Sequence, residues 1–441
     1  MVGSGVTKGA VLGGTCINVG CVPSKRLITV STFLEELRKR RYSGIEYTIG
    51  KLDYAKIIKE KDGLVEGLRA EKYAEVLEGL ENVTYINKIG KFVDANSIKV
   101  GTREIKSKYT LVATGAKSAV PQIKGIEKVS YLTNEEALAM EKLPKSLTVV
   151  GGRALGLEFA QLFAKFGVKV TLLQRSERII PNWEPEISEH LTEYLKANGV
   201  NIVTNATLVE INSKNRLKSI TAKVDGKEVV FDAEEVLFAT GRIANTENLG
   251  LDAAGVVLNE RGFIKVDKTL KTTAAKIYAA GDVTGEPMLE TLAAKEGNMA
   301  TSNIFENANK SINLNEIPSA IFTYPEAAMV GMTEEQVIKN KIKCSCSPLE
   351  FKFVAKAAII GDTRGLAKIV IDNKTKRILG VHILAPHAAE LIHEGVLAVK
   401  FGLTIDDIID TVHVFPTLSE GLKLAAMAFY QDVSKLSCCT V

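Results

Sequence analysis

Two cysteines near the start of the chain have a spacing that suits thiol redox chemistry. Cys16 and Cys21 lie five residues apart, whereas neighbours on one helix face are three or four apart. Gly20 permits the bend that brings both sulfurs together. Pro23 is typical of a first helical turn, so we expect Cys21 beside a helix N-terminus, where the dipole and the cation of Lys25 favour a thiolate. The pattern predicts a redox-active pair, with two buried structural cysteines as the alternative.

These thiols need a scaffold, and the spacing of apolar residues predicts an α/β protein built from several units. The length of 441 residues allows two or three domains. The expected helices are 27–41, 52–80, 157–166, 388–401 and 420–432, and the expected strands are 83–86, 97–100, 109–114, 147–150, 169–173, 367–371 and 378–383.

Composition excludes several classes of function. A net charge of +4 gives no reason to expect nucleic acid or a membrane as a partner. No apolar run approaches the ~18 residues of a membrane span, and the first residues lack the apolar core of a signal peptide. Paired thiols without a secretory signal indicate redox or metal chemistry in the cytoplasm. The six cysteines form three pairs, namely Cys16 and Cys21, Cys344 and Cys346, and Cys438 and Cys439.

The clearest nucleotide signal is the strand, turn and helix that begin at residue 147. Gly151, Gly152 and Gly156 form a turn between the strand and the helix, and this context places a pyrophosphate at a helix N-terminus. Arg153 takes the position of the second glycine of the usual fingerprint, so the phosphate geometry must adjust. A fold of this type without a cofactor is the alternative.

The end of the second strand of this unit favours NADPH over NADH. Gln174 stands where an acidic residue usually binds the ribose of NAD. Arg175 and Arg178 follow, and their guanidinium groups suit a 2′-phosphate. Surface arginines without a ligand are the alternative, and NADH remains possible.

The segment GGTCINVGCVPSK, residues 13–25, resembles the active-site disulfide segment of the pyridine nucleotide-disulfide oxidoreductases. The resemblance implies that the cysteine pair lies against the flavin of FAD, with Cys21 as the charge-transfer thiolate. It also implies that Glu158 pairs with Lys25 beside the flavin and the nicotinamide. The further cofactor contacts that it implies are Gly13, Gly14, Thr15, Thr114, Gly115, Gly241, Gly281 and Asp282, the aspartate binding ribityl hydroxyls.

The same resemblance predicts the fold class and the domains. We expect two Rossmann-like nucleotide-binding domains, for FAD and NAD(P), followed by an α+β interface domain that forms a homodimer. The expected boundaries are 1–117 for the first part of the FAD domain, 118–246 for the NAD(P) domain, 247–316 for the second part of the FAD domain and 317–441 for the interface domain. Because no strand–turn–helix arm precedes Gly13, we expect the first βαβ arm to be missing and FAD to bind weakly.

Two features near the C-terminus resemble the mercuric reductase branch of the family. Phe415 occupies the place of the histidine that acts as acid–base in the disulfide reductases, and a phenyl ring cannot transfer a proton. His413 matches a histidine that is not catalytic. Cys438 and Cys439 form a vicinal thiol pair, which suits soft metals better than a strained disulfide.

This branch implies a substrate, Hg(II), which Cys16 and Cys21 hold and the tail cysteines of the partner subunit deliver. It also implies that Tyr131 lines the metal site. A lipoamide dehydrogenase or glutathione-reductase-like enzyme is the first alternative, and a metal-binding protein without catalysis is the second. Cys344 and Cys346 share one face of an expected strand and suit a soft metal, although such residues are more often incidental.

Overall fold

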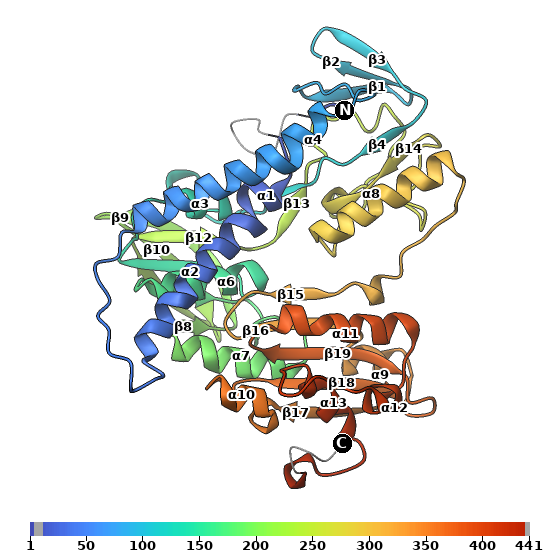
Figure 1. The fold of residues 1–441 in the computed structure, drawn as a ribbon. Helices are drawn as coiled ribbons and strands as arrows, with labels where there is room; N and C mark the ends of the chain where they lie inside the picture. Colours follow the sequence, from blue (N-terminus) through green and yellow to red (C-terminus); the bar gives the residue numbers. More distant parts are fainter. Residues whose placement is uncertain (4–11, 437–441) are drawn as a thin grey trace.

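The computed structural model describes residues 1–3 and 12–436. It confirms a mixed α/β fold, in which a discontinuous N-terminal domain, a central domain and a C-terminal domain lie side by side (Figure 1). The chain crosses from the first to the second domain and returns, so that short strands from the two passes pair with each other. Strand β5 (Ala116–Ser118) pairs with β13 (Arg242–Ala244), and β4 (Thr110–Val112) pairs in parallel with β14 (Ile277–Ala279).

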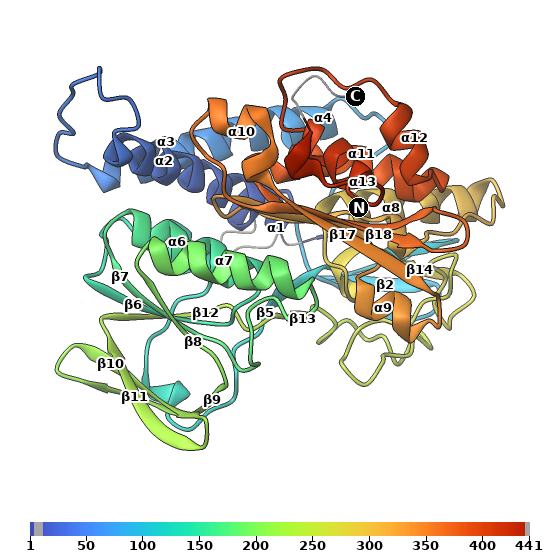
Figure 2. The ribbon, with the colours of Figure 1, turned by 90° about the horizontal axis from the view of Figure 1, so that it is seen from below.

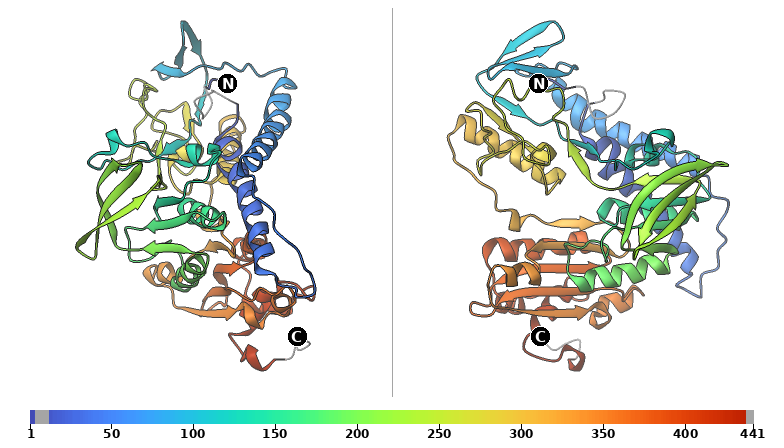
Figure 3. Two further views of the ribbon diagram at one scale, coloured as in Figure 1. Left: turned by 90° about the vertical axis from the view of Figure 1, so that its left-hand side faces the viewer. Right: turned by 180° about the vertical axis from the view of Figure 1, so that it is seen from behind.

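Two long helical segments organise the N-terminal domain. Helix α2 (Cys21–Lys39) packs beside α3 (Tyr54–Arg69), and both run along one edge of the molecule (Figure 3). A π-helical turn at Ala70–Ala74 continues α3 into the short α4 (Glu75–Glu78). The other elements of this domain are α1 (Thr15–Val19), β1 (Gly90–Asp94), β2 (Ser97–Val100), β3 (Arg103–Lys106) and α8 (Glu290–Phe305).

The central domain carries the parallel sheet that the sequence predicts. Its strands are ordered β12-β6-β7-β8, and their apolar side chains are buried as expected for a parallel sheet with covered faces. A three-stranded antiparallel sheet packs beside it. The elements are α5 (Asn134–Ala139), β6 (Ser146–Val150), α6 (Ala154–Lys165), β7 (Lys169–Leu173), α7 (Pro185–Ala197), β8 (Val200–Val203), β9 (Ala206–Lys214), β10 (Leu217–Val224), β11 (Lys227–Ala233) and β12 (Glu235–Phe238).

The C-terminal domain is a five-stranded antiparallel sheet of order β15-β16-β19-β18-β17. Helices α11 and α13 cover one face, and α7 of the central domain lies against the other (Figure 2). The elements are β15 (Ser319–Ile321), β16 (Glu326–Gly331), α9 (Glu334–Lys339), β17 (Cys344–Glu350), α10 (Ala355–Ile359), β18 (Leu366–Asp372), β19 (Ile378–Ala385), α11 (Ala388–Phe401), α12 (Ile405–Asp410) and α13 (Glu420–Met427).

Two expected elements differ from the structure. Residues 83–86 are not a strand, because among the described residues they make only one isolated bridge, between Ile86 and Val2. A strand needs several consecutive pairs with its neighbour. The last helix ends at Met427 rather than at residue 432. There the side chain of Asp432 accepts a hydrogen bond from the Ser434 amide and starts a separate 3₁₀ turn, as aspartate commonly does outside helices.

Candidate active site

The thiol pair lies where α1 meets α2. Cys16 is in α1 and Cys21 is the first residue of α2, so the expected position at a helix N-terminus is correct. Gly20 separates the helices, and a Cβ atom there would lie 2.8 Å from the Thr15 carbonyl oxygen. Only glycine fits this approach. Both cysteines are free thiols, Cys16 half-buried and Cys21 exposed.

The two sulfurs have opposite acid strengths. A hydrogen bond from the Cys16 thiol lowers the pKa of Cys21 to about 7, and the positive charge of Lys25 adds to this effect against the opposing influence of burial. The same hydrogen bond, together with burial, raises the pKa of Cys16. At neutral pH about half of the Cys21 side chains are therefore thiolates, while Cys16 keeps its proton.

Lys25 and Glu158 form the ion pair that was expected. The Lys25 ammonium lies 2.7 Å from the Glu158 carboxylate, whose side chain is only 4% exposed. The other carboxylate oxygen accepts a hydrogen bond of 2.9 Å from the Phe322 amide. Lys25 also lies 4.6 Å from the centre of the Phe322 ring. One carboxylate thus joins the thiol helix α2, the central-domain helix α6 and the first loop of the C-terminal domain.

Gln161, one helical turn after Glu158, secures that loop. Its side-chain oxygen accepts a 2.7 Å hydrogen bond from the Tyr324 amide, and its side-chain nitrogen donates to the Tyr324 carbonyl at 2.9 Å. Sequence reasoning missed this residue. Its position at i+3 from Glu158 on the same helix face was the available signal.

Two further residues that the sequence did not single out hold the thiol segment. Asn134 donates to the Val19 carbonyl at 2.6 Å, and Ser118 donates to Asn134 at 2.7 Å. Arg242 donates to the Thr15 hydroxyl at 3.1 Å and forms an ion pair of 3.3 Å with Asp282. Arg242 directly follows the Thr240-Gly241 turn, so its adjacency to that motif could have pointed to it.

Three of the glycines expected to contact FAD have open space beside their backbone. No heavy atom lies within 4 Å of the place that a Cβ would take at Gly14, Gly115 or Gly241. By contrast, Gly13 has a φ of +98°, and a Cβ there would lie 2.7 Å from Ile17. Gly14 and Gly241 are exposed and Gly115 is half-buried, and we call the open backbone at these three glycines the cradle.

The second expected FAD motif lies beside this cradle. Gly281 has a φ of +76°, which favours glycine. Burial raises the pKa of Asp282 although Arg242 opposes the shift. Thr114 donates its hydroxyl to the Asn245 carbonyl at 2.8 Å, which ties the two chain crossings together. The residues present therefore fit the flavin end of FAD, where Asp282 would accept hydrogen bonds from hydroxyl groups.

The glycine turn of the central domain is tight, as its fingerprint predicts. Gly151 has a φ of +113°, and a Cβ there would lie 2.3 Å from the Ala239 carbonyl oxygen. A Cβ at Gly156 would lie 1.8 Å from the Gly151 oxygen, so the helix needs glycine to pack this closely on the turn. The Gly152 amide donates to the Gln174 side chain at 2.9 Å. Arg153 is the N-cap of α6 and its side chain is exposed, 3.6 Å from Glu286.

The two arginines expected at a 2′-phosphate differ in their surroundings. Arg178 donates to the carbonyls of Pro181 and Trp183, at 2.9 and 3.4 Å. Its guanidinium therefore supports the loop before α7. Arg175 is exposed, which leaves it as the better candidate of the two for a phosphate contact.

Tyr131 is half-buried and packs against the apolar core of the central domain. Its ring packs edge-on against Phe238, with 5.5 Å between the ring centres, and belongs to the apolar cluster of that domain. No interaction joins it to Cys16 or Cys21 in the part of the chain that the structure describes. Its surroundings favour a packing role over the expected lining of a metal site.

Of the features expected near the C-terminus, His413 and Phe415 lie within the residues that the structure describes. His413 lies 2.8 Å from Glu394, and this pairing suits the structural role expected for it. Phe415 is 52% exposed. Cys438 and Cys439 lie outside the described residues.

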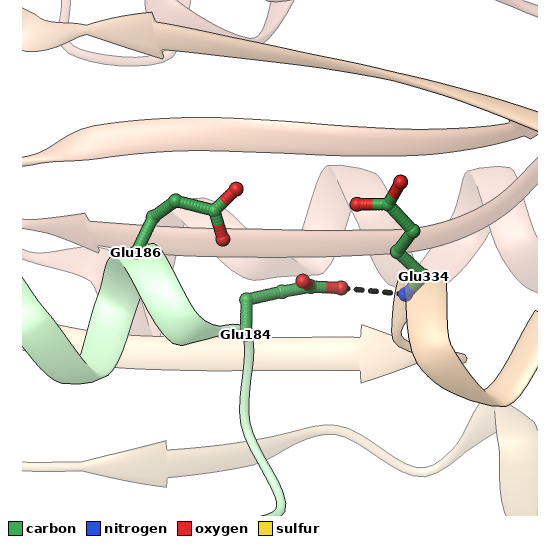
Figure 4. A group of neighbouring side chains, drawn as sticks. All are labelled: Glu184, Glu186 and Glu334. Atoms are coloured by element: carbon green, nitrogen blue, oxygen red, sulfur yellow. Dashed lines mark hydrogen bonds between the residues drawn. The ribbon is translucent and has the colours of Figure 1, made fainter. Parts of the chain in front are cut away.

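Within residues 1–3 and 12–436, one group of three acidic side chains is close enough to hold a metal ion. Glu184, Glu186 and Glu334 come together between α7 and α9 (Figure 4). The ammonium of Lys368 lies 2.9, 2.7 and 3.0 Å from them in that order and already fills the position of a cation. The group is therefore an ionic joint between the central and C-terminal domains, in which Lys368 and Glu184 are buried and the other two carboxylates are partly exposed.

Among the described residues, no helix has the length and the apolar character that crossing a membrane requires.

Comparison with known proteins places these features in a family. The model of the pyridine nucleotide-disulphide oxidoreductases matches residues 3–297, and that of their dimerisation domain matches residues 317–426. The chain is 41% identical to the mercuric reductase of Bacillus cereus over 436 residues, covering 98% of this chain and 68% of that protein. It is 35% identical to the dihydrolipoyl dehydrogenase of Chlamydia pneumoniae, over 92% of this chain and 87% of the other.

The crystal structure of LpdA from Mycobacterium tuberculosis superposes with a TM-score of 0.86 at 27% identity, covering 96% of this chain and 92% of that one. The chain thus belongs to the pyridine nucleotide-disulphide oxidoreductase family, whose members use FAD and a pyridine nucleotide.

Proposed function

We propose that this protein reduces Hg(II) to Hg(0) with electrons from NADPH. The observation that carries the proposal is Phe415 in the place of a catalytic histidine. His413 pairs with Glu394 instead of compensating. Reduction of an organic disulfide requires a proton donor for the leaving thiolate, whereas reduction of Hg(II) releases neutral metal and needs none.

The thiol pair supplies the ligands for the substrate. Cys21 offers a thiolate near neutral pH because its pKa is lowered to about 7, and soft thiolates bind soft metals. Cys16 holds the remaining proton, which binding of Hg(II) displaces. Two electrons then convert the bound Hg(II) to Hg(0), and both sulfurs are left as thiolates that can accept the next ion.

FAD, when bound, supplies the two-electron carrier between the nicotinamide and the thiols. Gly14, Gly115 and Gly241 would leave room for its ring, and Asp282 would accept hydrogen bonds from its hydroxyl groups. Lys25 and Glu158 fix the position of α2 at this place. Arg175 favours NADPH as the donor, since its exposed guanidinium can pair with a 2′-phosphate.

The active form that we propose is a homodimer in which Cys438 and Cys439 of one subunit deliver Hg(II) to the other. Apolar side chains on the C-terminal domain support association, because this single chain leaves them open to water. They are Leu397, Phe401, Val412, Val414 and Phe415, with exposed fractions from 52% to 90%.

A second candidate function is reduction of a lipoamide-like disulfide, which the similarity to dihydrolipoyl dehydrogenase favours. The test compares NADPH oxidation by the purified protein with Hg(II) and with lipoamide as acceptors, after bound flavin has been measured from the visible spectrum. We expect turnover with Hg(II) that Cys21→Ala abolishes. Turnover with lipoamide alone would overturn the proposal, and absence of flavin together with Hg(II) binding would indicate a metal-binding protein.

The variant Phe415→His tests whether Phe415 in the place of the catalytic histidine decides the substrate. It restores an imidazole at the expected acid–base position, so it should raise the low disulfide activity without raising Hg(II) turnover. Equal disulfide activity in the wild type and the variant would show that residue 415 does not decide the substrate.

A further inference from the structure

A second pair of thiols lies on the edge strand of the C-terminal sheet. Cys344 and Cys346 are alternate residues of β17, and both are half-buried free thiols. Alternate residues of a strand share one face of a sheet. Leu349, an odd number of positions away, belongs to the apolar core on the other face. The two sulfurs therefore lie together, away from that core.

Polar groups from β17, β18 and α9 meet on the thiol face. Cys346 pairs across the ladder with Val370, two residues from Lys368, so Lys368 shares this face. The Glu334 carboxylate lies 3.0 Å from the Lys368 ammonium and also neighbours the Cys346 thiol. Burial, with the charge of Glu334, raises the pKa of Cys346. The site thus offers two sulfurs and a nearby carboxylate oxygen.

The spacing of the two thiols suits a metal better than a disulfide. Alternate Cα atoms of a strand are about 6.6 Å apart, and their Cα–Cβ bonds are roughly parallel. A disulfide needs Cβ atoms only ~3.5–4.5 Å apart. A cation with two metal–sulfur bonds of about 2.3 Å accepts a separation of up to ~4.6 Å between the sulfurs, which rotation of the two side chains toward each other can reach.

We propose that Cys344 and Cys346 form a second binding site for a thiophilic divalent cation, distinct from the pair Cys16 and Cys21. Binding replaces two thiol protons with one cation, so no oxidant or reductant is required. Soft ligands select ions such as Hg(II) over Mg²⁺ or Ca²⁺. The carboxylates of Glu184 and Glu186 are not ligands of this site, because the Lys368 ammonium is already paired with both of them.

The test isolates this pair in the full chain. Four substitutions, Cys16→Ala, Cys21→Ala, Cys438→Ala and Cys439→Ala, leave Cys344 and Cys346 as the remaining thiols of the six cysteines. Hg(II) is titrated in the presence of a competing monothiol, and free thiols are counted with a chromogenic disulfide. We expect one Hg(II) per chain and the loss of two reactive thiols for each ion bound.

A matched control keeps two thiols but moves one to the opposite face. In that background, Cys346→Ser combined with Ser347→Cys separates the sulfurs across the sheet. Because the chelate is lost, affinity should fall about a hundredfold. Equal affinity in the control, or two Hg(II) ions per chain with one thiol each, would overturn the proposal.

A second measurement uses the wild-type protein, in case the fourfold variant does not fold. Cleavage after Lys343 and Lys352 releases both cysteines in one peptide, residues 344–352. Native protein is treated with Hg(II), washed with the competing monothiol and then alkylated, and the peptide is analysed by mass spectrometry. Joint protection of both cysteines supports the site. Alkylation of both, or a disulfide between them after mild oxidation, contradicts the geometric argument.

Discussion

Replacing Cys16 by alanine should raise the pKa of Cys21. The Cys16 thiol is the largest of the causes that lower that pKa from the ordinary 9.0 to about 7. Such a change corresponds to about 2.7 kcal/mol of preference for the thiolate, since one pH unit equals ~1.36 kcal/mol. Because burial also acts on Cys21 and raises its pKa, the alanine variant should approach or exceed 9.0.

Two further variants separate the causes. Cys16→Ser keeps a donor at the same place, so the pKa of Cys21 should remain well below 9.0. Lys25→Met removes the second favourable cause, but Glu158 opposes Lys25 at this sulfur. We therefore expect a smaller rise with Lys25→Met than with Cys16→Ala.

The assay must measure the midpoint of a pH profile rather than one rate. At pH 8 a change in pKa from 7 to 9 lowers the thiolate fraction about tenfold. However, nucleophilicity rises with pKa, with a Brønsted coefficient of ~0.4–0.5, so the thiolate becomes about six- to tenfold more reactive. The two effects nearly cancel, and a single alkylation rate would hide the change.

Alkylation of the reduced protein is therefore followed from pH 5 to 10, with the peptide that contains Cys21 quantified by mass spectrometry. The wild-type profile should rise through a midpoint near 7, because the thiolate forms as pH increases. If the Cys16→Ala profile also keeps its midpoint near 7, the hydrogen bond is not the cause. The helix N-terminus or Lys25 would then account for the acidity of Cys21.

Three further predictions concern the surroundings of the site. Gln161→Leu leaves the Tyr324 amide and carbonyl without partners and should lower stability by ~1–3 kcal/mol; an unchanged thermal midpoint would contradict this. Lys368→Met leaves Glu184 buried and uncompensated and should cost about 3–5 kcal/mol. The exchange of backbone amide hydrogens should then become faster in α7 and β18. Adding Glu184→Gln removes the uncompensated charge and should restore part of the protection. If it restores none, the charge is not the cause of the destabilisation. Arg175→Ala should raise the KM for NADPH roughly tenfold, which corresponds to about 1.4 kcal/mol, and should leave the KM for NADH unchanged. Arg178→Ala should instead lower the thermal midpoint of unfolding. The reverse outcome would place the 2′-phosphate at Arg178.

Local sequence determined the parts of the site whose geometry depends on a few consecutive residues. The break at Gly20 and the start of α2 at Cys21 follow from glycine, proline and spacing alone. The close approach of Gly156 to the turn follows in the same way, because a Cβ there would lie 1.8 Å from the Gly151 carbonyl oxygen. These features need no distant partner, so the pattern of residue types was enough to predict them.

The tertiary structure decided which side chain each functional group meets. The family resemblance implied the pair of Glu158 with Lys25, but the Phe322 amide that Glu158 also binds lies 164 positions away and was not expected. Arg178 is engaged by two carbonyl oxygens of its own loop, and Tyr131 faces Phe238. Lys368 contacts Glu184 and Glu186, which belong to another domain. These outcomes depend on how whole elements pack against one another. Packing determines the partners of a side chain, its burial and the charges around it, and the neighbouring residues in the sequence do not determine any of these.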